Sequence, residues 1–365
     1  MPKITKVEAI PFRLPMTSSL KWGAASHMDV VEHVLVRVTT DAGQVGLAEA
    51  TPRPTIYGET PESVQVIINK HLAPMLLNQA IESREDIIAL NRKMVIIVNN
   101  HTAKGALDIC LHEALALSQG QTLFTWFNSD HRRIKVSYIL GMADLNSMLQ
   151  EAEVVYEQGV RVFKVKVGRD FMHDMALIQA LQSEFQGQEV TIYADANECF
   201  SPNKAADKLR HLTELGVLYV EEPLPVELIE ARKSLRAQNI LPLIADDSTF
   251  TPRDLSRELA FNTFDILNIK TARTGYTQSN YMLTLARQHE KGVMVGSQAS
   301  STLGTIRAAI FAAQAGIDYP SELSFFLKLK ADIMSQPIQL TEGYLDINTL
   351  TEIELDEARL NAMAI

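Results

Sequence analysis

Two lysines, Lys164 and Lys166, occupy alternate positions of the short apolar segment VFKVKVG at residues 162–168. Successive side chains of a β-strand point to opposite faces, so both ammonium groups lie on one face. Burying one lysine is costly, and burying two side by side costs more. The segment is therefore either an edge strand with one face in water or part of a charged site. Residues elsewhere in the chain must decide between these alternatives.

The apolar segments that follow also end in charged residues. Three successive segments end in acids, and the next one ends in a lysine. Because strand side chains alternate, only one acid of each doublet can face inward, and the sequence does not show which one. The candidates are Asp195 in YADAN, Glu221 or Glu222 in VEEP, Asp246 or Asp247 in ADDS, and Lys270 in NIKT.

Three carboxylates that meet at one point repel one another and raise each other's pKa unless a cation lies between them. Oxygen ligands favour a hard divalent cation, so we expect Mg²⁺, with Mn²⁺ as an alternative. A salt-bridge network without metal is the competing explanation. Lysines on both sides of the cation suit proton transfer at a carbon next to a carboxylate, with the pKa of Lys166 lowered by the cation and by Lys164.

The elements that must position these residues show a regular repeat. Eight short apolar segments alternate with helical patterns, and residues near their ends, from Leu140 to Glu322, recur every 24 to 29 residues. Eight such units predict an α/β barrel of the (β/α)8 type, a modified TIM barrel, in which strand ends form the active site. An open doubly wound sheet is the alternative, but no glycine-rich dinucleotide loop follows the first segment.

The remaining segments predict an α+β capping domain. An alternating segment and a hairpin around Thr40–Gly43 precede three helical patterns, at about 61–78, 83–97 and 103–119. The segment QPIQLTEGYLDI near the C-terminus predicts a strand pair that rejoins the N-terminal sheet. The expected division is a capping domain at 1–130, a barrel catalytic domain at 131–330 and a C-terminal segment at 331–365 that returns to the capping domain.

Composition excludes several classes of protein. The 365 residues have a net charge of −10, and no run of Lys and Arg is long enough to follow a phosphate backbone, so we expect no nucleic-acid partner. Cys110 and Cys199 are the only cysteines and have no CxxC spacing, which suits a reducing compartment. No signal peptide and no apolar run of about 18 residues is found, so we expect a cytoplasmic protein with no membrane partner.

The segments KVKVG, DAN, VEEP, ADDS and NIKT, together with RPTIYGET and HTAKGALDICLHEAL, resemble the muconate lactonizing (muconate cycloisomerase) subgroup of the enolase superfamily. The resemblance covers nearly the whole chain. Asp247 departs from the glutamate more usual at its position. The roles that the resemblance implies are metal ligands for Asp195, Glu221 and Asp246, an acid/base pair for Lys166 and Lys270, a contact with a substrate carboxylate for Lys164, and support around the metal for Asn197 and Asp247.

The resemblance implies a Mg²⁺-dependent muconate cycloisomerase, most like the anti-adding branch, that interconverts cis,cis-muconate or a substituted muconate and muconolactone through a metal-stabilised enolate. The segment from Pro320 to Ser324 lacks the Asp-x-Asp of dipeptide epimerases, and its Glu322 resembles cycloisomerases. The alternatives are a racemase or epimerase of a dipeptide or N-acylamino acid, and a catalytically silent member that binds a carboxylate. The implied partner is a small carboxylate substrate, and the implied assembly is a homo-oligomer.

Two loops of the capping domain are expected to close over the substrate, one from Leu20 to His27 and one from Pro54 to Glu59. The further candidates for substrate contact are Trp22, His27, Tyr57 and Ser297.

Overall fold

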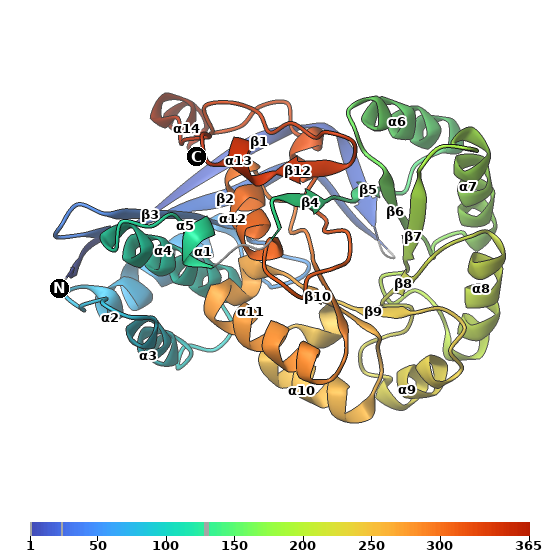
Figure 1. Cartoon of the computed structure of the whole chain (residues 1–365), viewed down its shortest axis with the longest axis horizontal. Coiled ribbons are helices and arrows are strands. Elements are labelled where there is room, and N and C mark those ends of the chain that lie inside the picture. Colours follow the sequence, from blue (N-terminus) through green and yellow to red (C-terminus); the bar gives the residue numbers. More distant parts are fainter. Residues whose placement is uncertain (1, 23–24, 128–130) are drawn as a thin grey trace.

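An antiparallel sheet begins the chain in the computed structural model, which describes residues 2–22, 25–127 and 131–365 (Figure 1). The long strand β1 (Ile4–Trp22) pairs with β2 (Ser26–Thr40), and β2 pairs with β3 (Val45–Ala50). The hairpin between β2 and β3 turns at Gly43, whose φ of 86° suits glycine. The expected hairpin is therefore confirmed.

Helices follow this sheet where the sequence pattern predicts them. The first predicted helix is interrupted by a π-helical turn, and Asn100, with a φ of 53°, precedes the long third helix. The elements are α1 (Pro61–Ile67), the π-helical turn Ile68–Leu72, α2 (Ala73–Leu76), α3 (Arg84–Met94), α4 (His101–Ser118) and the short α5 (Leu123–Trp126).

Seven parallel strands form the second sheet, in the order β11-β10-β9-β8-β7-β6-β5. Each strand pairs with its neighbour in the chain, so the strand order runs in one direction without the reversal that a doubly wound sheet requires. The open doubly wound alternative is therefore excluded. The strands are β5 (Tyr138–Leu140), β6 (Val162–Lys166), β7 (Thr191–Asp195), β8 (Val220–Glu221), β9 (Leu243–Ala245), β10 (Ile266–Ile269) and β11 (Gly292–Val295).

The eighth position of the ring is filled by an extended segment at 319–322, where the sequence signal was weakest. Glu322 N–H donates to Val295 O of β11 at 2.8 Å, and Ser137 N–H, just before β5, donates to Ser321 O at 2.8 Å. The segment thus joins the last strand to the first. The expected barrel-type fold with an N-terminal capping domain is confirmed.

Helices connect the strands on the outside of the barrel (Figure 1). No helix in the ranges that the structure describes is long and apolar enough to cross a membrane. The connecting helices are α6 (Leu145–Glu157), α7 (Phe171–Glu184), α8 (Pro202–Glu214), α9 (Ile229–Ala237), α10 (Pro252–Phe261), α11 (Thr271–Gln288) and α12 (Thr302–Ala312), with 3₁₀ turns at Asp247–Thr249 and Phe325–Lys328.

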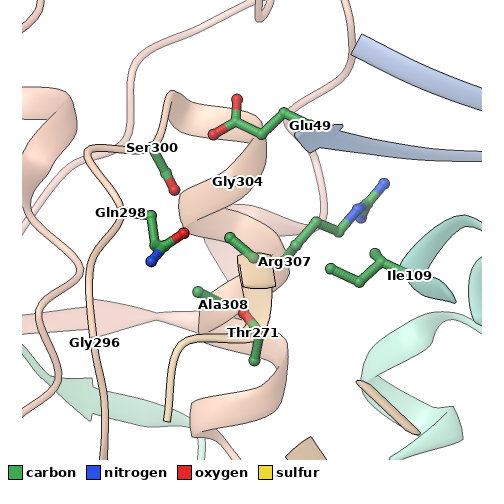
Figure 2. Close-up of a pocket in the computed structure, with 10 residues that line it drawn as sticks. Glu49, Ile109, Thr271, Gly296, Gln298, Ser300, Gly304, Arg307 and Ala308 are labelled. Carbon is green, nitrogen blue, oxygen red and sulfur yellow. The ribbon is translucent and has the colours of Figure 1, made fainter. Parts of the chain in front are cut away.

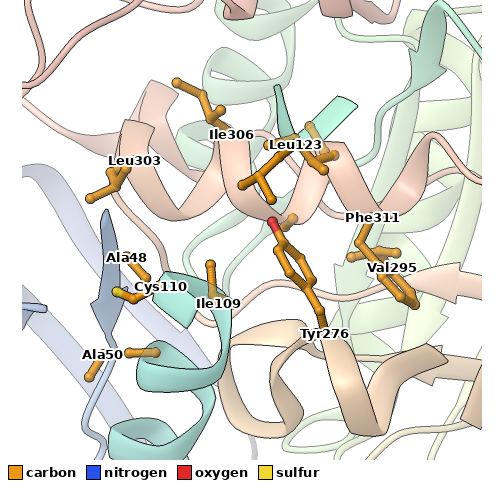
Figure 3. Close-up of a cluster of buried hydrophobic side chains, with 14 of the residues drawn as sticks. Ala48, Ala50, Ile109, Cys110, Leu123, Tyr276, Val295, Leu303, Ile306 and Phe311 are labelled. Atoms are coloured by element: carbon orange, nitrogen blue, oxygen red, sulfur yellow. The ribbon is translucent and has the colours of Figure 1, made fainter. Parts of the chain in front are cut away.

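The hydrophobic interior is divided between two large clusters. One joins the capping domain to β9–β11 and α10–α12, and it includes Cys110, Tyr276 and Phe311 (Figure 3). The other lies under β5–β9 and α6–α9. The barrel is therefore supported by two large cores, and the capping domain shares its core with the half that bears Lys270.

The C-terminal segment reaches the first sheet by a different route from the expected one. The strand β12 (Tyr344–Asp346) pairs with β4 (Arg133–Lys135), not with the N-terminal sheet. After α13 (Ile347–Leu350) and α14 (Glu357–Met363), Ile365 N–H donates to Pro11 O of β1 at 3.1 Å. The expected domain boundary at residue 130, and residues 23–24 of the expected loop, lie outside the described residues.

The loop between β6 and α7 is held by one buried acid. Asp174, in the first turn of α7, accepts a hydrogen bond from Gly168 N–H at 2.6 Å and is only 4% exposed. Gly168 has a φ of 122°, and a Cβ there would lie 2.5 Å from the Cβ of Cys199. Burial raises the pKa of Asp174 to about 6.

We expect the free energy of unfolding of the wild type to fall, relative to that of Asp174→Asn, as the pH rises. The raised pKa means that ionisation of Asp174 in the folded state lowers stability progressively from pH 3.8 to about 6. Asparagine keeps the acceptor oxygen and cannot ionise, so its advantage at pH 7 should be about 1–2 kcal/mol larger than at pH 4. Urea unfolding at the two pH values measures it. The exposed control Asp207→Asn should show no such trend, and equal trends in both variants would contradict this account.

Candidate active site

A cavity of about 480 Å³ lies between the carboxyl ends of the barrel strands and the capping domain. Lys166 at the end of β6 and Lys270 just after β10 both line it. In a ring of eight positions, β6 and β10 are the second and sixth and therefore face each other across the barrel. The cavity thus has a lysine on each of two opposite sides, with Asp246, Asp247 and Asn197 also in its wall.

Lys164 lies beneath this cavity, surrounded by carboxylates. All five residues of β6 are buried, and the strand lies between β5 and β7, so the edge-strand alternative is wrong. The Lys164 ammonium is 2.9 Å from Asp195 Oδ2, 2.9 Å from Glu221 Oε2 and 2.5 Å from Glu322 Oε1. Burial lowers its pKa, but these three acids outweigh burial and hold the pKa well above its ordinary value.

Lys166 contacts the same acid from the cavity side. Its ammonium lies 2.5 Å from Asp195 Oδ2 and donates to Asn197 Oδ1 at 2.9 Å. Asn197 N–H donates to Asp195 Oδ1 at 2.9 Å, and its φ of 40° places the residue in the left-handed region. The turn after β7 therefore orients both Asp195 and the lysine beside it.

Lys270 is paired with Asp246 on the opposite side. Arg273 Nη2 donates to Asp246 O at 2.9 Å, and Nη1 donates to Asp247 Oδ1 at 3.2 Å. Burial lowers the pKa of Lys270, but Asp246 and Asp247 outweigh it and hold the pKa above its ordinary range. The paired carboxylates thus raise the pKa of both Lys164 and Lys270, and a cation that took up their negative charge would remove this cause.

The structure also shows which residue of the VEEP doublet faces inward. Glu221 points to Lys164, whereas Glu222 points away and accepts from Asp246 N–H at 2.9 Å and Ser248 N–H at 3.0 Å. Arg232 lies 2.9 Å from Glu222 Oε1. Glu222 therefore fixes the backbone that presents Asp246. In the ADDS doublet both acids reach the cavity wall.

The contacts as they stand are those of the competing salt-bridge network. Asp195 and Asp246 pair with lysines, and among the described residues no group of His, Cys, Asp and Glu is spaced to hold a metal ion. The network is nevertheless unbalanced. Glu221 Oε2 accepts no hydrogen bond despite its burial, although Lys164 lies within ion-pair distance. Burial and the surrounding acids raise the pKa of Glu221 well above its ordinary value.

The donor set therefore fits a hard divalent cation. Among the described residues, the ion pairs of this network join five carboxylates to four basic groups, Lys164, Lys166, Lys270 and Arg273. A cation would neutralise the excess negative charge that otherwise favours a protonated Glu221. The residues that would hold it are Asp195, Glu221 and Asp246.

The expected substrate contacts separate into two groups. Trp22 and Ser297 line the cavity, whereas His27, Tyr57 and Glu322 do not. The His27 side chain is 65% exposed and lies 3.9 Å from Asp29. Tyr57 packs edge-on against Phe250, with ring centroids 5.3 Å apart. Glu322 lies below the cavity, where it forms an ion pair with Lys164 and accepts a hydrogen bond from Ser297 N–H at 2.8 Å.

Arg53 is a cavity residue that the sequence argument missed. Arg53 follows β3 of the capping domain, lines the cavity and is 8% exposed. Nη2 donates to Gln298 O at 2.8 Å and lies 3.0 Å from His33 Nε2, whose Nδ1 is 3.4 Å from Glu49. Burial lowers the pKa of Arg53 to about 10, so it is charged at neutral pH. The available signal was the position of Arg53 directly before the loop Pro54–Glu59, which was expected to close over the substrate.

We expect Lys164→Met to destabilise the protein by about 3–5 kcal/mol, because it leaves three buried carboxylates without their shared cation. Adding Mg²⁺ should restore part of the loss, since a ligand that binds the folded state stabilises it. Chemical unfolding with and without Mg²⁺ measures both effects. The control is Lys6→Met, whose side chain is 62% exposed and paired only with Glu8. Equal losses in the two variants would contradict the central role of Lys164.

Comparison with known proteins identifies similar chains over most of the length. The family described as "Enolase C-terminal domain-like" matches residues 147–352, and "Mandelate racemase / muconate lactonizing enzyme, N-terminal domain" matches residues 7–126. The chain is 29% identical to L-Ala-D/L-Glu epimerase of Bacillus subtilis over 337 residues, which is 91% of each chain. It is 27% identical to muconate cycloisomerase 1 of Rhodococcus opacus over 93% of this chain and 92% of that one.

A solved structure is similar over the full length. The muconate lactonizing enzyme from Mucobacterium Smegmatis, complexed with muconolactone, has a TM-score of 0.92 and 33% sequence identity, and the match covers 100% of both chains.

Proposed function

Because the chain belongs to the enolase superfamily, and is an isomerase of that superfamily, we propose that it is a Mg²⁺-dependent muconate cycloisomerase. The substrate would be cis,cis-muconate or a substituted muconate, and the product muconolactone. The observation on which the proposal depends is that Lys166 and Lys270 line one cavity from opposite sides, with carboxylates suited to a divalent cation beside them.

The reaction requires one new C–O bond and one proton transfer. A carboxylate oxygen of muconate adds to the far carbon of the double bond conjugated with the other carboxylate. The carbon next to that second carboxylate then takes a proton, which a lysine ammonium in the cavity supplies. The reverse reaction returns this proton to the lysine. The lactone carries one proton more than the muconate dianion, and the lysine regains that proton from solvent, so no second organic substrate is needed.

The position of the two lysines determines the stereochemistry. Since they lie on opposite sides of the cavity, each can protonate only one face of the carbon. The resemblance favours the anti-adding branch, and the lysine that donates the proton would decide it. Bound at Asp195, Glu221 and Asp246, the cation would supply positive charge where negative charge develops on the substrate carboxylate.

The rest of the cavity wall is suited to a conjugated dicarboxylate. Apolar side chains from both domains line it, and Arg53 of the capping domain adds a positively charged residue to the wall. A second carboxylate on the substrate could pair with this charge. The apolar residues are Leu20, Trp22, Met28, Ile56, Ile139, Val226, Phe250 and Phe325.

A second candidate is a racemase or epimerase of a dipeptide or N-acylamino acid. Two lysines on opposite sides of one carbon suit removal of a proton from one face and delivery to the other. The similarity to the Bacillus subtilis epimerase also favours this candidate. It differs from the cycloisomerase in one measurable respect, because it exchanges the substrate's α-hydrogen with solvent without forming a lactone.

We expect the purified protein to remove the ultraviolet absorbance of cis,cis-muconate when Mg²⁺ is present and to stop when the metal is chelated. Lys166→Met and Lys270→Met should each change turnover, and the variant lacking the proton donor should lose about 10²- to 10⁴-fold in kcat. NMR in D₂O identifies the product. No lactone, together with deuterium incorporation into a dipeptide or N-acylamino acid, would reject the cycloisomerase and support the epimerase.

We expect Arg53→Met to raise KM for muconate by about 10- to 100-fold, since a hydrogen bond to a charged group contributes about 1.5–3 kcal/mol. A muconate monoester, which lacks one carboxylate charge, serves as the control substrate. Its KM should change much less. If both substrates lose affinity equally, Arg53 supports the loop but does not recognise the second carboxylate.

A further inference from the structure

The helix that follows Lys270 is divided near its start. Gly275 within α11 has φ 62° and ψ −170°, so Thr271–Thr274 form a separate turn and a second helical segment begins at Tyr276. The first N–H groups of a helix have no partner within the helix. Here a carboxylate from the capping domain, that of Asp108, binds the first of these N–H groups.

Asp108 of α4 accepts hydrogen bonds from the first two N–H groups of this second segment, those of Tyr276 and Thr277. Its Oδ2 accepts from Tyr276 N–H at 2.5 Å and Thr277 N–H at 2.9 Å, and its Oδ1 accepts from Thr277 Oγ1 at 2.6 Å. Asn91 of α3 also donates to Oδ1. Asp108 is 1% exposed, so its carboxylate is shielded from solvent. The capping domain thus supplies the N-terminal cap of a barrel helix.

The two domains leave no free space at this contact. A Cβ at Gly275 would lie 2.5 Å from Asp108 Oδ2, and one at Gly105 would lie 2.6 Å from Ala272 O. The adjacent cavity between the two domains, which Ile109 and Thr271 help to line, measures about 10 Å³, or about one water (Figure 2). Tyr276 packs beside Ile109 and Phe311 in the shared core (Figure 3).

The turn that Asp108 restrains also orients the Lys270 side of the site. Lys270 O accepts from Arg273 N–H at 3.0 Å and from Thr274 Oγ1 at 3.0 Å. Arg273 in turn binds Asp246 and Asp247. A shift of this turn therefore moves Lys270 and the proposed metal ligand Asp246 together. Lys166, whose strand belongs to the other core, is not attached to it.

We propose that Asp108 is a positioning residue that sets the location of Lys270 and Arg273 from the capping domain. The inference rests on the proposed function insofar as Lys270 acts on the substrate. It adds a residue that contacts neither substrate nor metal, and it makes correct docking of the capping domain a condition for one of the two lysines to act.

A matched control lies on the same helix. Glu113 of α4 is also a carboxylate that joins the capping domain to the barrel, since it accepts from Arg307 Nη2 of α12 at 2.7 Å and from Leu47 N–H at 2.6 Å. Within the part of the chain that the structure describes, Glu113 has no hydrogen bond or ion pair with the turn at 271–277, so its loss should weaken docking without moving Lys270.

The test compares Asp108→Asn with Glu113→Gln in the Mg²⁺-loaded protein. Amide hydrogen exchange of residues 271–279 should be about tenfold or more faster in Asp108→Asn, and kcat should fall by about 10- to 100-fold with KM changed less than about threefold. Glu113→Gln should lower Tm comparably, keep exchange at 271–279 slow and retain kcat within about twofold. Unchanged exchange in Asp108→Asn, or equal loss of kcat in both variants, would overturn the proposal.

A milder variant keeps the proposal testable if Asp108→Asn does not fold. Thr277→Val removes one hydrogen bond to Asp108 and should show the same changes at smaller size. If the wild type converts none of the substrates, the proposed function fails, and hydrogen exchange alone decides the role of Asp108. Faster exchange at 271–279 in Asp108→Asn than in Glu113→Gln then supports it, and equal exchange rejects it.

Discussion

Carboxylates buried within a few ångströms of one another can remain ionised only if positive charge lies among them. At the mouth of this barrel that charge comes from Lys164, whose ammonium contacts Asp195, Glu221 and Glu322 from three different strand positions. Lys166 and Lys270 then complete the pairing from the cavity side. Lys164 thus binds three of the acidic residues below the cavity. Lys166 and Lys270, the two lysines that could transfer protons, therefore lie in the cavity wall and each pair with one acid.

The division of the interior into two cores gives the site two separately supported sides. Lys166 and Asp195 lie on strands of the half that packs around Phe163 and Leu177, whereas Lys270 lies on the half that continues into the capping domain. Substrate and cation would bind where these halves meet. Their relative position is set by the ring of strands, by the charged residues that bridge it, and by a smaller apolar cluster that joins Val162 of β6 to Ile266 of β10.

Much of this arrangement could be predicted from the sequence, because strand ends in a barrel converge and the 24- to 29-residue repeat identified those ends. Strand alternation alone left the inward acid of VEEP open, because β8 has only two residues, and it was the resemblance that pointed to Glu221. Glu322 was expected to contact substrate, but Lys164 binds it below the cavity. Arg53 and Asp108 were missed because their partners are 245 and 168 residues away in the chain, at Gln298 and Tyr276.

The two cores also differ in when they can be completed during synthesis. All buried members of the second core lie in one continuous stretch of the chain, from Tyr138 to Leu243, so this core can form once the ribosome has released that stretch. The other core combines Ile4 with Leu360, so the capping domain lacks part of its packing surface until the segment around Leu360 has been synthesised. The N-terminal third of the protein is therefore fully packed only after a segment more than 200 residues beyond it has joined the same core.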